Sequence, residues 1–244
     1  ITPLREKIHA LSQCHLDEVI IARFNQTIAS LGAEDFIKKI LVDTLHVEWL
    51  MVGEAFRFGK GRTGTTDDLE KAGHRYGFHT EILPAVTDMN GRISSSAIRL
   101  ALEQGDFETV ATLLGRPYTI SGHIVHGDKI GRGLGFPTAN IPIRHYNPIL
   151  SGVFITRVHG LADKPLPSVS MIGTRPTIES DRHIMLETHI LDFHRNCYSS
   201  LIEVEFLKKL RDNQKFPDLG ALTAAIGKDV AAARSYFEKT LSKS

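Results

Sequence analysis

The chain has 244 residues, of which 42% are hydrophobic and 23% charged, the composition of an ordinary globular protein that can bury a core. Its 29 Lys and Arg residues against 28 Asp and Glu residues give a formal net charge of +1, which disfavours nucleic acids and anionic membranes as partners because both attract a basic excess. No apolar run approaches the roughly 18 residues that a membrane-spanning helix needs.

The two cysteines and the first residue bear on where the protein works. Cys14 and Cys197 lie far apart in the sequence and have no zinc-type spacing, so we expect free thiols in a reducing compartment, the cytoplasm. The chain begins with Ile1 and shows no signal peptide, and we expect a fragment whose true beginning is missing. The sequence leaves the oligomeric state open, a homo-oligomer included.

The first 115 residues predict an α/β domain, because helical periodicity alternates with short apolar runs. In chain order we first expect a helix with Thr2 as N-cap, Pro3 as first helical residue and Leu4, Ile8 and Leu11 on one face. We then expect a strand at Val19–Phe24, a helix at Glu34–Leu45, a strand at Val47–Val52, a helix at Asp67–Tyr76, a strand at Phe78–Val86, and two short helices at Ala97–Leu102 and Phe107–Leu114. Strands that alternate with helices need crossover connections, so the sheet is expected to be parallel.

From residue 116 onward the pattern changes to short apolar runs separated by glycine and proline. Strands are expected at Tyr118–Val125, Ala139–Ile143, Val153–Val158, Ser168–Ile172, Met185–Leu191 and Leu201–Phe206. Short strands with turns and no helices between them predict an antiparallel sheet closed into a small barrel. An apolar stripe from Leu219 to Phe237 predicts a terminal helix that packs on this barrel.

Two segments of the first half could bind a nucleotide or another ligand. Residues 59–64 (GKGRTG) match the pattern G-x-G-x-x-G, but six residues separate them from the preceding strand, so a ligand loop at a strand end is favoured over a dinucleotide turn. Ser94, Ser95 and Ser96 precede Arg99 at a helix start, where free N–H groups and the helix dipole attract phosphate. A plain serine N-cap explains the same pattern.

The stretch 127–140 (GDKIGRGLGFPTAN) contains most of the chemistry that the sequence offers. Its glycines, together with Lys129 and Arg132, predict a flexible basic loop that approaches phosphates closely, although a plain glycine-rich hairpin remains the alternative. Thr138 and Asn140 are two residues apart on a strand and therefore share a face. Both carry neutral oxygen ligands of the kind that Mg²⁺ accepts beside substrate phosphates.

Two further segments carry side chains suited to catalysis or flavin binding. Glu187 interrupts an apolar strand and shares a face with His189. If Glu187 points into a barrel interior, it could accept a proton from an attacking hydroxyl, whereas an outward-facing Glu187 would be an ordinary surface residue. Residues 210–216 (LRDNQKF) follow the last strand and could bring the planar cation of Arg211, with an aromatic ring, over a ring system.

These segments resemble a known enzyme family over essentially the whole chain. Residues 131–140 (GRGLGFPTAN), 171–178 (MIGTRPTI), 186–193 (LETHILDF) and 210–216 resemble the riboflavin kinase module. Residues 52–64 (VGEAFRFGKGRTG) and 93–99 (ISSSAIR) resemble the FMN adenylyltransferase module. Their order is that of the bacterial bifunctional riboflavin kinase/FAD synthetase, with domains expected at residues 1–115 and 116–244.

The resemblance implies a fold and a distribution of roles. It implies an incomplete Rossmann-like α/β nucleotidyltransferase domain, followed by a six-stranded antiparallel β-barrel kinase domain with a C-terminal helix. In the kinase it implies that Gly131, Arg132, Gly133, Gly135, Thr138 and Asn140 bind ATP, that Thr138 and Asn140 hold Mg²⁺, that Glu187 is the catalytic base and that Arg211 contacts the flavin. In the adenylyltransferase it implies ATP binding by Ser94, Ser95 and Arg99, and flavin binding by Phe56 and Phe58.

The sequence departs from the family pattern in two places that matter. The family's nucleotide signature, Gly-x-Phe-Asp-Gly-x-His followed by Gly-His, is absent, so we expect this chain to make FMN but no FAD. Ala55 stands where the family usually has Asp or Asn, which removes a polar contact near the flavin. The expected substrates and products are ATP, riboflavin, FMN and FAD. A barrel that binds flavin or nucleotide without chemistry remains the alternative.

Overall fold

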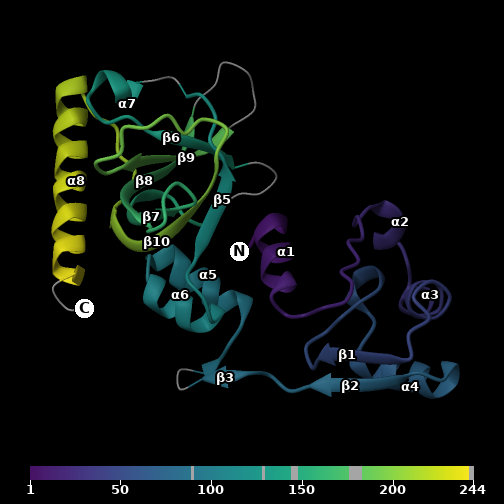
Figure 1. Ribbon diagram of the computed structural model, residues 1–244. Helices are drawn as coiled ribbons and strands as arrows, with labels where there is room; N and C mark the ends of the chain where they lie inside the picture. The colour runs from purple at the N-terminus through teal and green to yellow at the C-terminus, as the bar shows by residue number, and fades with distance from the viewer. Residues whose placement is uncertain (89–90, 128–129, 144–147, 176–182, 242–244) are drawn as a thin grey trace. The chain divides into compact units, whose positions relative to one another are not determined.

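The computed structural model describes residues 1–88, 91–127, 130–143, 148–175 and 183–241. Two compact units account for the chain (Figure 1). One unit is residues 17–93, and the other joins residues 1–16 to residues 94–244. The helices α5 and α6 thus belong to the same compact unit as the strands of the second half, and the domain boundary expected after residue 115 remains a prediction.

The unit of residues 17–93 is built on a strand–helix–strand crossover, which confirms the α/β prediction. Strands β1 (Trp49–Gly53) and β2 (His79–Leu83) pair in parallel, and α4 (Thr66–Tyr76) connects them. Helix α4 begins at a capping box, in which Thr65 accepts a hydrogen bond from the Asp68 N–H, and it ends at Gly77 with φ 85°. Its buried face packs Leu69 and Ala72 against the core of this unit.

The remaining elements of this unit are short. Two predictions for this unit, one helix and one strand, differ from the structure. They are α2 (Gln26–Ala29), α3 (Ala33–Asp35), the π-helix Phe36–Val42, the 3₁₀ turn Lys60–Arg62, and the hairpin of β3 (Thr87–Asp88) and β4 (Gly91–Arg92). The helix expected at Glu34–Leu45 therefore ends at Val42 and is mostly π-helical. The strand expected at Val19–Phe24 is wrong: no described strand pairs with this run, and Phe24 is 79% exposed.

Three helices of the larger unit come before its barrel strands in the described part of the chain. They are α1 (Leu4–Ser12), α5 (Ser95–Gln104) and α6 (Phe107–Leu114). Helix α1 begins one residue later than expected, with Pro3 at the N-cap position. Gly105 and Gly115 end α5 and α6 in the left-handed conformation, at φ 72° and 68°, as glycine allows without a steric cost.

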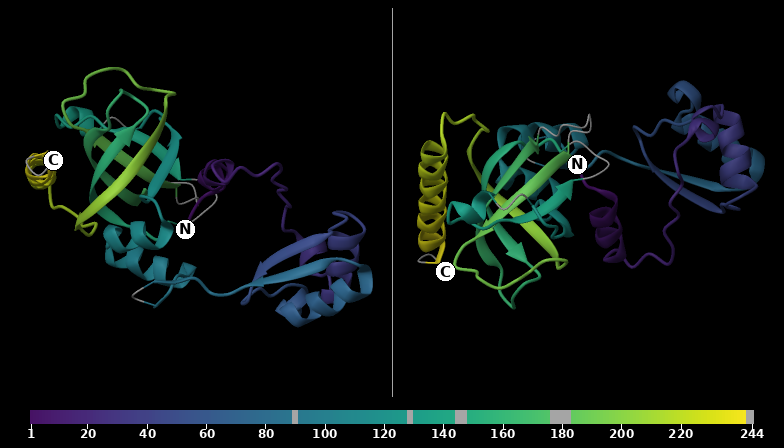
Figure 2. Two further views of the ribbon diagram at one scale, coloured as in Figure 1. Left: turned by 60° about the horizontal axis from the view of Figure 1, so that its bottom comes forward. Right: turned by 90° about the horizontal axis from the view of Figure 1, so that it is seen from above.

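Six antiparallel strands form a near-closed barrel, as the sequence predicted (Figure 2). They are β5 (Thr119–His123), β6 (Ala139–Ile143), β7 (Gly152–His159), β8 (Leu166–Arg175), β9 (His183–Ile190) and β10 (Leu201–Arg211), in the spatial order β5-β10-β7-β8-β9-β6. The two edge strands approach each other, since a Cβ on Gly122 of β5 would collide with Ile141 of β6. A short helix, α7 (Ile130–Gly133), lies between β5 and β6.

Apolar side chains pack on both faces of the barrel sheet: throughout the interior, and on part of the outer face. The interior is filled by a cluster that includes Ile141, Phe154, Ile172, Leu186 and Phe206. The outer face of β7 and β8 packs under α8 (Leu219–Leu241) (Figure 1), and Phe237 is among the α8 residues in this packing. Strand alternation therefore assigns every residue of these strands either to the interior or to an outer face that is also partly buried.

Candidate functional site

The predicted base and the predicted metal ligands meet on neighbouring strands of the barrel. Asn140 of β6 lies directly opposite Glu187 of β9 in the antiparallel register. Directly opposite residues point to the same side of a sheet with Cβ atoms about 4.5–5.5 Å apart. Their neighbours Ile141 and Leu186 fill the interior, so Asn140 and Glu187 face outward. The interior position considered for Glu187 is therefore wrong, but Glu187 is half-buried rather than an ordinary exposed residue.

Thr138 joins this pair through the side chain of Asn140. The Asn140 amide Nδ2 donates to the backbone oxygen of Thr138 at 3.1 Å and to its Oγ1 at 3.4 Å. Asn140 is only 4% exposed, because the segment after β5 passes over it. In that segment Val125 pairs with Asn140 in an antiparallel bridge, and a Cβ on Gly127 would come within 2.6 Å of the Asn140 Nδ2. The absence of a side chain at residue 127 thus leaves the room that the amide occupies.

The glycine-rich segment folds into a compact turn rather than a simple hairpin. Helix α7 contains Gly131 and Arg132, and the Phe136 N–H donates to the Gly131 oxygen at 2.7 Å. A Cβ on Gly131 would come within 2.5 Å of the Phe136 oxygen, and Gly135 has φ 87°, so both positions favour glycine. Gly133 has open space around its Cα. The second basic residue expected in this loop, Lys129, lies outside the described residues, as do residues 176–178 of the second kinase segment.

His189 fastens the end of this turn to the strand that carries Glu187. Its Nδ1 lies 2.8 Å from the backbone oxygen of Pro137, and because a carbonyl only accepts, Nδ1 carries the proton. The ring also meets Phe136 edge-on, with centroids 5.5 Å apart. Sequence reasoning placed His189 beside Glu187 but assigned it no task; the structure shows that it holds the residues just before Thr138.

A cavity of about 310 Å³ opens beside Thr138 and Arg132. Its walls come from the glycine-rich turn, from β9 and from the loop after β9, and they include Thr188, Cys197 and Tyr198. Neither Asn140 nor Glu187 lines this cavity, so Thr138 is the residue that belongs to both the cavity and the outward-facing pair. The pKa of the Cys197 thiol is raised by burial, which keeps it protonated and excludes a thiolate nucleophile here at neutral pH.

Tyr198 is a wall of this cavity that the sequence did not reveal. Its hydroxyl accepts a hydrogen bond from the Arg132 guanidinium at 3.4 Å, and its ring lies 3.8 Å from that of His126. Tyr198 lies 66 residues after Arg132 in the chain, whereas His126 and Arg132 are close in sequence. No periodicity or motif could have brought them together in advance.

The predicted flavin contact Arg211 lies at the far end of the same outward row. In register, Asn140 pairs with Glu187, Glu187 with Met171, Met171 with Val153, and Val153 with Arg211. At about 4.8 Å between strands, Arg211 lies three spacings or roughly 14 Å from Glu187 along the sheet.

Arg211 itself is held by two partners that fix its plane. Its Nη2 lies 2.7 Å from Asp229 Oδ2 of α8, and its Nε lies 3.0 Å from the other carboxylate oxygen. The guanidinium also lies over the ring of Phe216, 5.6 Å from the centroid. The predicted pairing of a planar cation with an aromatic ring is therefore present, and Asp229 is a partner that sequence reasoning missed.

The residues predicted for the second nucleotide site fall into the two compact units. Ser94 is the N-cap of α5, where its hydroxyl accepts from the Ala97 N–H at 3.2 Å, with Ser95 in the first turn and an exposed Arg99 one turn on. The serine N-cap considered from the sequence is thus present. It does not exclude a phosphate at the same helix end.

Phe56 and Phe58 lie in the unit of residues 17–93 and differ in exposure. Phe58 is 5% exposed and packs on Phe36 with centroids 5.3 Å apart, whereas Phe56 is 38% exposed and stacks on Phe58 at 5.7 Å. Phe58 and Gly64 also exchange backbone hydrogen bonds of 3.2 and 2.9 Å. The loop between them is therefore a tight hairpin, not a glycine turn that leads from a strand into a helix.

Comparisons with known proteins find matches over nearly the whole chain. A family model described as riboflavin kinase matches residues 114–237, and one described as FAD synthetase matches residues 1–97. The chain is 44% identical over 240 residues to the bifunctional riboflavin kinase/FMN adenylyltransferase of Escherichia coli strain K12, covering 98% of this chain and 76% of that protein. It is 42% identical over 235 residues to the protein of the same name from Haemophilus influenzae, covering 96% and 76%.

A solved structure has the same arrangement of elements. The crystal structure of a protein from Streptococcus pneumoniae described as a macrolide-efflux protein superposes with a TM-score of 0.73 at 27% identity, over 95% of this chain and 74% of that one. In the described part of the present chain, no helix combines the length and the apolar character needed to cross a membrane.

Proposed function

Because the chain belongs to the family of bifunctional riboflavin kinases/FMN adenylyltransferases, we propose that the outward-facing group of Glu187, Asn140 and Thr138 is where its barrel phosphorylates riboflavin. The two reactions of the family are the ATP-dependent phosphorylation of riboflavin to FMN and the adenylylation of FMN to FAD. ATP, riboflavin and FMN are accordingly substrates or products. The observation that carries the proposal is the register that sets Asn140 opposite Glu187, with Thr138 bonded to the same amide.

Glu187 is proposed as the base that takes the proton from the ribityl 5′-hydroxyl of riboflavin. Phosphoryl transfer depends mostly on positioning and on stabilising charge, so one well-placed carboxylate suffices for the proton. Antiparallel hydrogen bonds to β6 and β8 hold the strand of Glu187 on both sides. The carboxylate is therefore carried by rigid backbone and needs no loop movement to reach its place.

The oxygen atoms of Thr138 and Asn140 fit a hard divalent cation. Both side chains are neutral and they lie together, and the missing side chain of Gly127 leaves the room that the Asn140 amide occupies. Mg²⁺ accepts one or two protein oxygens and completes its shell with water and substrate phosphates. When bound, Mg²⁺ would neutralise charge on the phosphates of ATP.

The glycine-rich turn is proposed to hold the phosphates of ATP. Gly131, Gly133 and Gly135 carry no side chains that would keep a phosphate away from the backbone of the turn, and Arg132 adds a positive charge at the cavity beside Thr138. His189 of β9 is hydrogen-bonded to Pro137 at the end of this turn, so the turn that would bind phosphate is attached to the strand that carries Glu187.

The flavin end of riboflavin is proposed to lie toward Arg211. Glu187 and Arg211 lie roughly 14 Å apart in strand register, a separation suited to an elongated substrate whose hydroxyl end reacts and whose ring end is anchored. Val153 of the row between them is buried under α8, so the substrate would not lie along the row itself. Asp229 and Phe216 hold the planar guanidinium in one orientation, which favours stacking on a ring.

We propose an adenylyltransferase domain at residues 1–115 and a kinase domain at residues 116–244; the two family models match residues 1–97 and 114–237. Ser94, Ser95 and Arg99 at the start of α5 would bind the triphosphate of ATP through free N–H groups and the guanidinium. Phe56, the more exposed of the two phenylalanines, would contact the flavin, and the buried Phe58 would stack on the ring of Phe56. The two free cysteines support a reducing compartment, and we propose the cytoplasm.

The test is FMN formation from riboflavin, ATP and Mg²⁺, followed by chromatography of the flavins. Glu187→Gln keeps the shape of the side chain but cannot take a proton, and we expect kcat to fall by roughly 10²-fold or more with the KM for riboflavin little changed. Asn140→Ala should raise the Mg²⁺ concentration needed for half-maximal rate. Glu108→Gln, the same chemical change at an exposed site on α6, is the matched control. A Glu187→Gln enzyme with normal turnover would refute the assignment of the base.

A further inference from the structure

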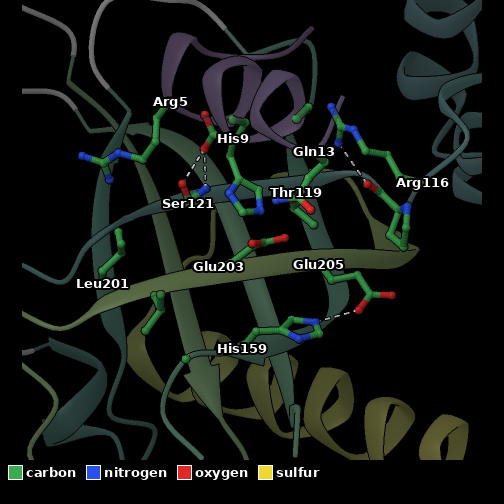
Figure 3. Close-up of a pocket in the computed structure, with 15 residues that line it drawn as sticks. Arg5, His9, Gln13, Arg116, Thr119, Ser121, His159, Leu201, Glu203 and Glu205 are labelled. Carbon is green, nitrogen blue, oxygen red and sulfur yellow. Dashed lines mark hydrogen bonds and ion pairs between the residues drawn. The ribbon is translucent and has the colours of Figure 1, made fainter. Parts of the chain in front are cut away.

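A second cavity, of about 600 Å³, lies in the larger unit (Figure 3). It is bounded by α1, by the start of β5, by the end of β7 and by β10. None of its lining residues also lines the cavity beside Thr138. Its volume is within the range of roughly 300–1,000 Å³ typical of small-molecule sites. The proposed kinase and adenylyltransferase sites do not use it.

A buried carboxylate in this cavity has an oxygen with no partner. Glu6 of α1 is 8% exposed, and its Oε1 accepts hydrogen bonds of 2.7 Å from both the N–H and the hydroxyl of Ser121. Among the residues that the structure describes, no donor reaches its other oxygen, Oε2. A buried carboxylate oxygen that lacks a donor is costly, which points to a donor brought by a ligand.

A second carboxylate stands next to the first. Glu203 of β10 is directly opposite Ser121 of β5, so its side chain rises from the same face of the sheet, close to the Glu6 carboxylate. Figure 3 shows Glu203 projecting into the middle of the cavity beneath His9. Within the described ranges Glu203 makes no hydrogen bond or ion pair, and two adjacent carboxylates without a counter-charge repel each other.

The basic residues around the cavity do not neutralise this pair. His159 lies 2.8 Å from Glu205, a third carboxylate of the wall, and Arg157 lies 3.7 Å from it, so Glu205 is already paired. Arg116 donates to the Pro117 backbone oxygen, and Arg5 extends toward the edge of the cavity (Figure 3). Part of the remaining wall is apolar, formed by Ala10, Pro117, Leu201 and Ile202, and Gln13, Thr119 and His9 also line the cavity.

We propose that this cavity binds a small aliphatic amine with at least two ammonium groups. The ammonium groups would donate to Glu6 Oε2 and to the Glu203 carboxylate, and the methylene spacer would lie on the apolar wall formed by Leu201 and Pro117. Because Glu6 belongs to α1 and Glu203 to the barrel, such a ligand joins this helix to the sheet and stabilises their packing.

Titration calorimetry of the full chain with 1,5-diaminopentane tests the proposal, and 1,5-pentanediol is the neutral control of the same length. We expect the diamine to bind more weakly as salt rises, and the diol to give no heat of binding. Glu203→Gln removes a charge that no described residue pairs with, so the fold should tolerate it, and we expect it to raise the Kd roughly tenfold or more. The exposed Glu108→Gln should leave the Kd unchanged.

A second readout does not depend on variants. The imidazole resonances of His9 and His159, which line the cavity, should shift on addition of the diamine, whereas a saturating nucleotide should not displace it. Equal behaviour of diamine and diol, equal effects of Glu203→Gln and Glu108→Gln, or an absence of shifts at both histidines would each overturn the proposal. None of these results bears on FMN formation, so the two proposals fail separately.

Discussion

Adding one methyl group at Gly127 should disturb the kinase reaction without unfolding the barrel. A Cβ at this position would lie 2.6 Å from Asn140 Nδ2 and 2.8 Å from its Oδ1, whereas ordinary van der Waals contact begins near 3.4 Å. The Asn140 amide must therefore move by about 0.8 Å, and a misplacement of about 1 Å in a catalytic group can lower a rate by about 10²-fold. Gly127 has no positive φ, so the alanine itself introduces no backbone strain.

The measurement is kcat for FMN formation by Gly127→Ala together with its free energy of unfolding in urea. We expect kcat to fall by roughly 10-fold to 10²-fold while the unfolding free energy changes much less. Gly227→Ala in α8 is the matched control, since nothing lies within 4 Å of the added Cβ and its φ is not positive. Normal turnover of Gly127→Ala, or a loss of turnover that unfolding alone accounts for, would contradict the role given to the Asn140 amide.

Three further predictions concern the supports of the site and of the fold. Asp229→Ala leaves the half-buried Arg211 guanidinium without its carboxylate, and we expect it to lower the unfolding free energy by about 3 kcal/mol, against little change for the exposed Glu238→Ala in the same helix. His189→Ala removes the hydrogen bond to Pro137, and we expect it to raise the KM for ATP more than the KM for riboflavin; equal effects on both would show that His189 does not hold the glycine-rich turn. Hydrogen bonds from the hydroxyl and then the backbone N–H of Thr109 lower the pKa of Asp106, the N-cap of α6, below its usual 3.8. The stability that this cap contributes is complete above the ordinary carboxyl pKa and is lost as the pH falls through the lowered value, so Asp106→Asn should flatten the acid limb of a plot of unfolding free energy against pH.

Local chemistry was enough to predict most individual elements of the barrel. The strand at Ala139–Ile143 has the same bounds in the structure, because Pro137 precedes the apolar run and a charged residue follows it in the sequence. The longer strand β10, expected to end at Phe206, continues to Arg211, since its pairing with β7 extends past two register shifts that no local pattern reveals. The run at Val19–Phe24 has the composition of a strand but lacks a described partner, and a strand needs one.

The candidate site likewise combines features that the sequence predicts with features that only the structure shows. The types of its residues and the pairs at short spacing, Thr138 with Asn140 and Glu187 with His189, could be read along the chain because strand geometry fixes which neighbours share a face. Whether that face points inward was undecidable, since the interior and the surface under α8 are both apolar. The structure shows that the outer face carries these residues.

The amino-acid sequence by itself determined the kinds of element, their order and the short motifs, because propensity, alternation and turn chemistry act within a few residues. Only the tertiary structure decided that Asn140 faces Glu187, that Asp229 orients Arg211, and that Glu6 meets Ser121 beside Glu203. Each of these contacts joins residues far apart in the chain. Their positions follow from strand register and helix packing, which depend on the whole barrel rather than on any local pattern.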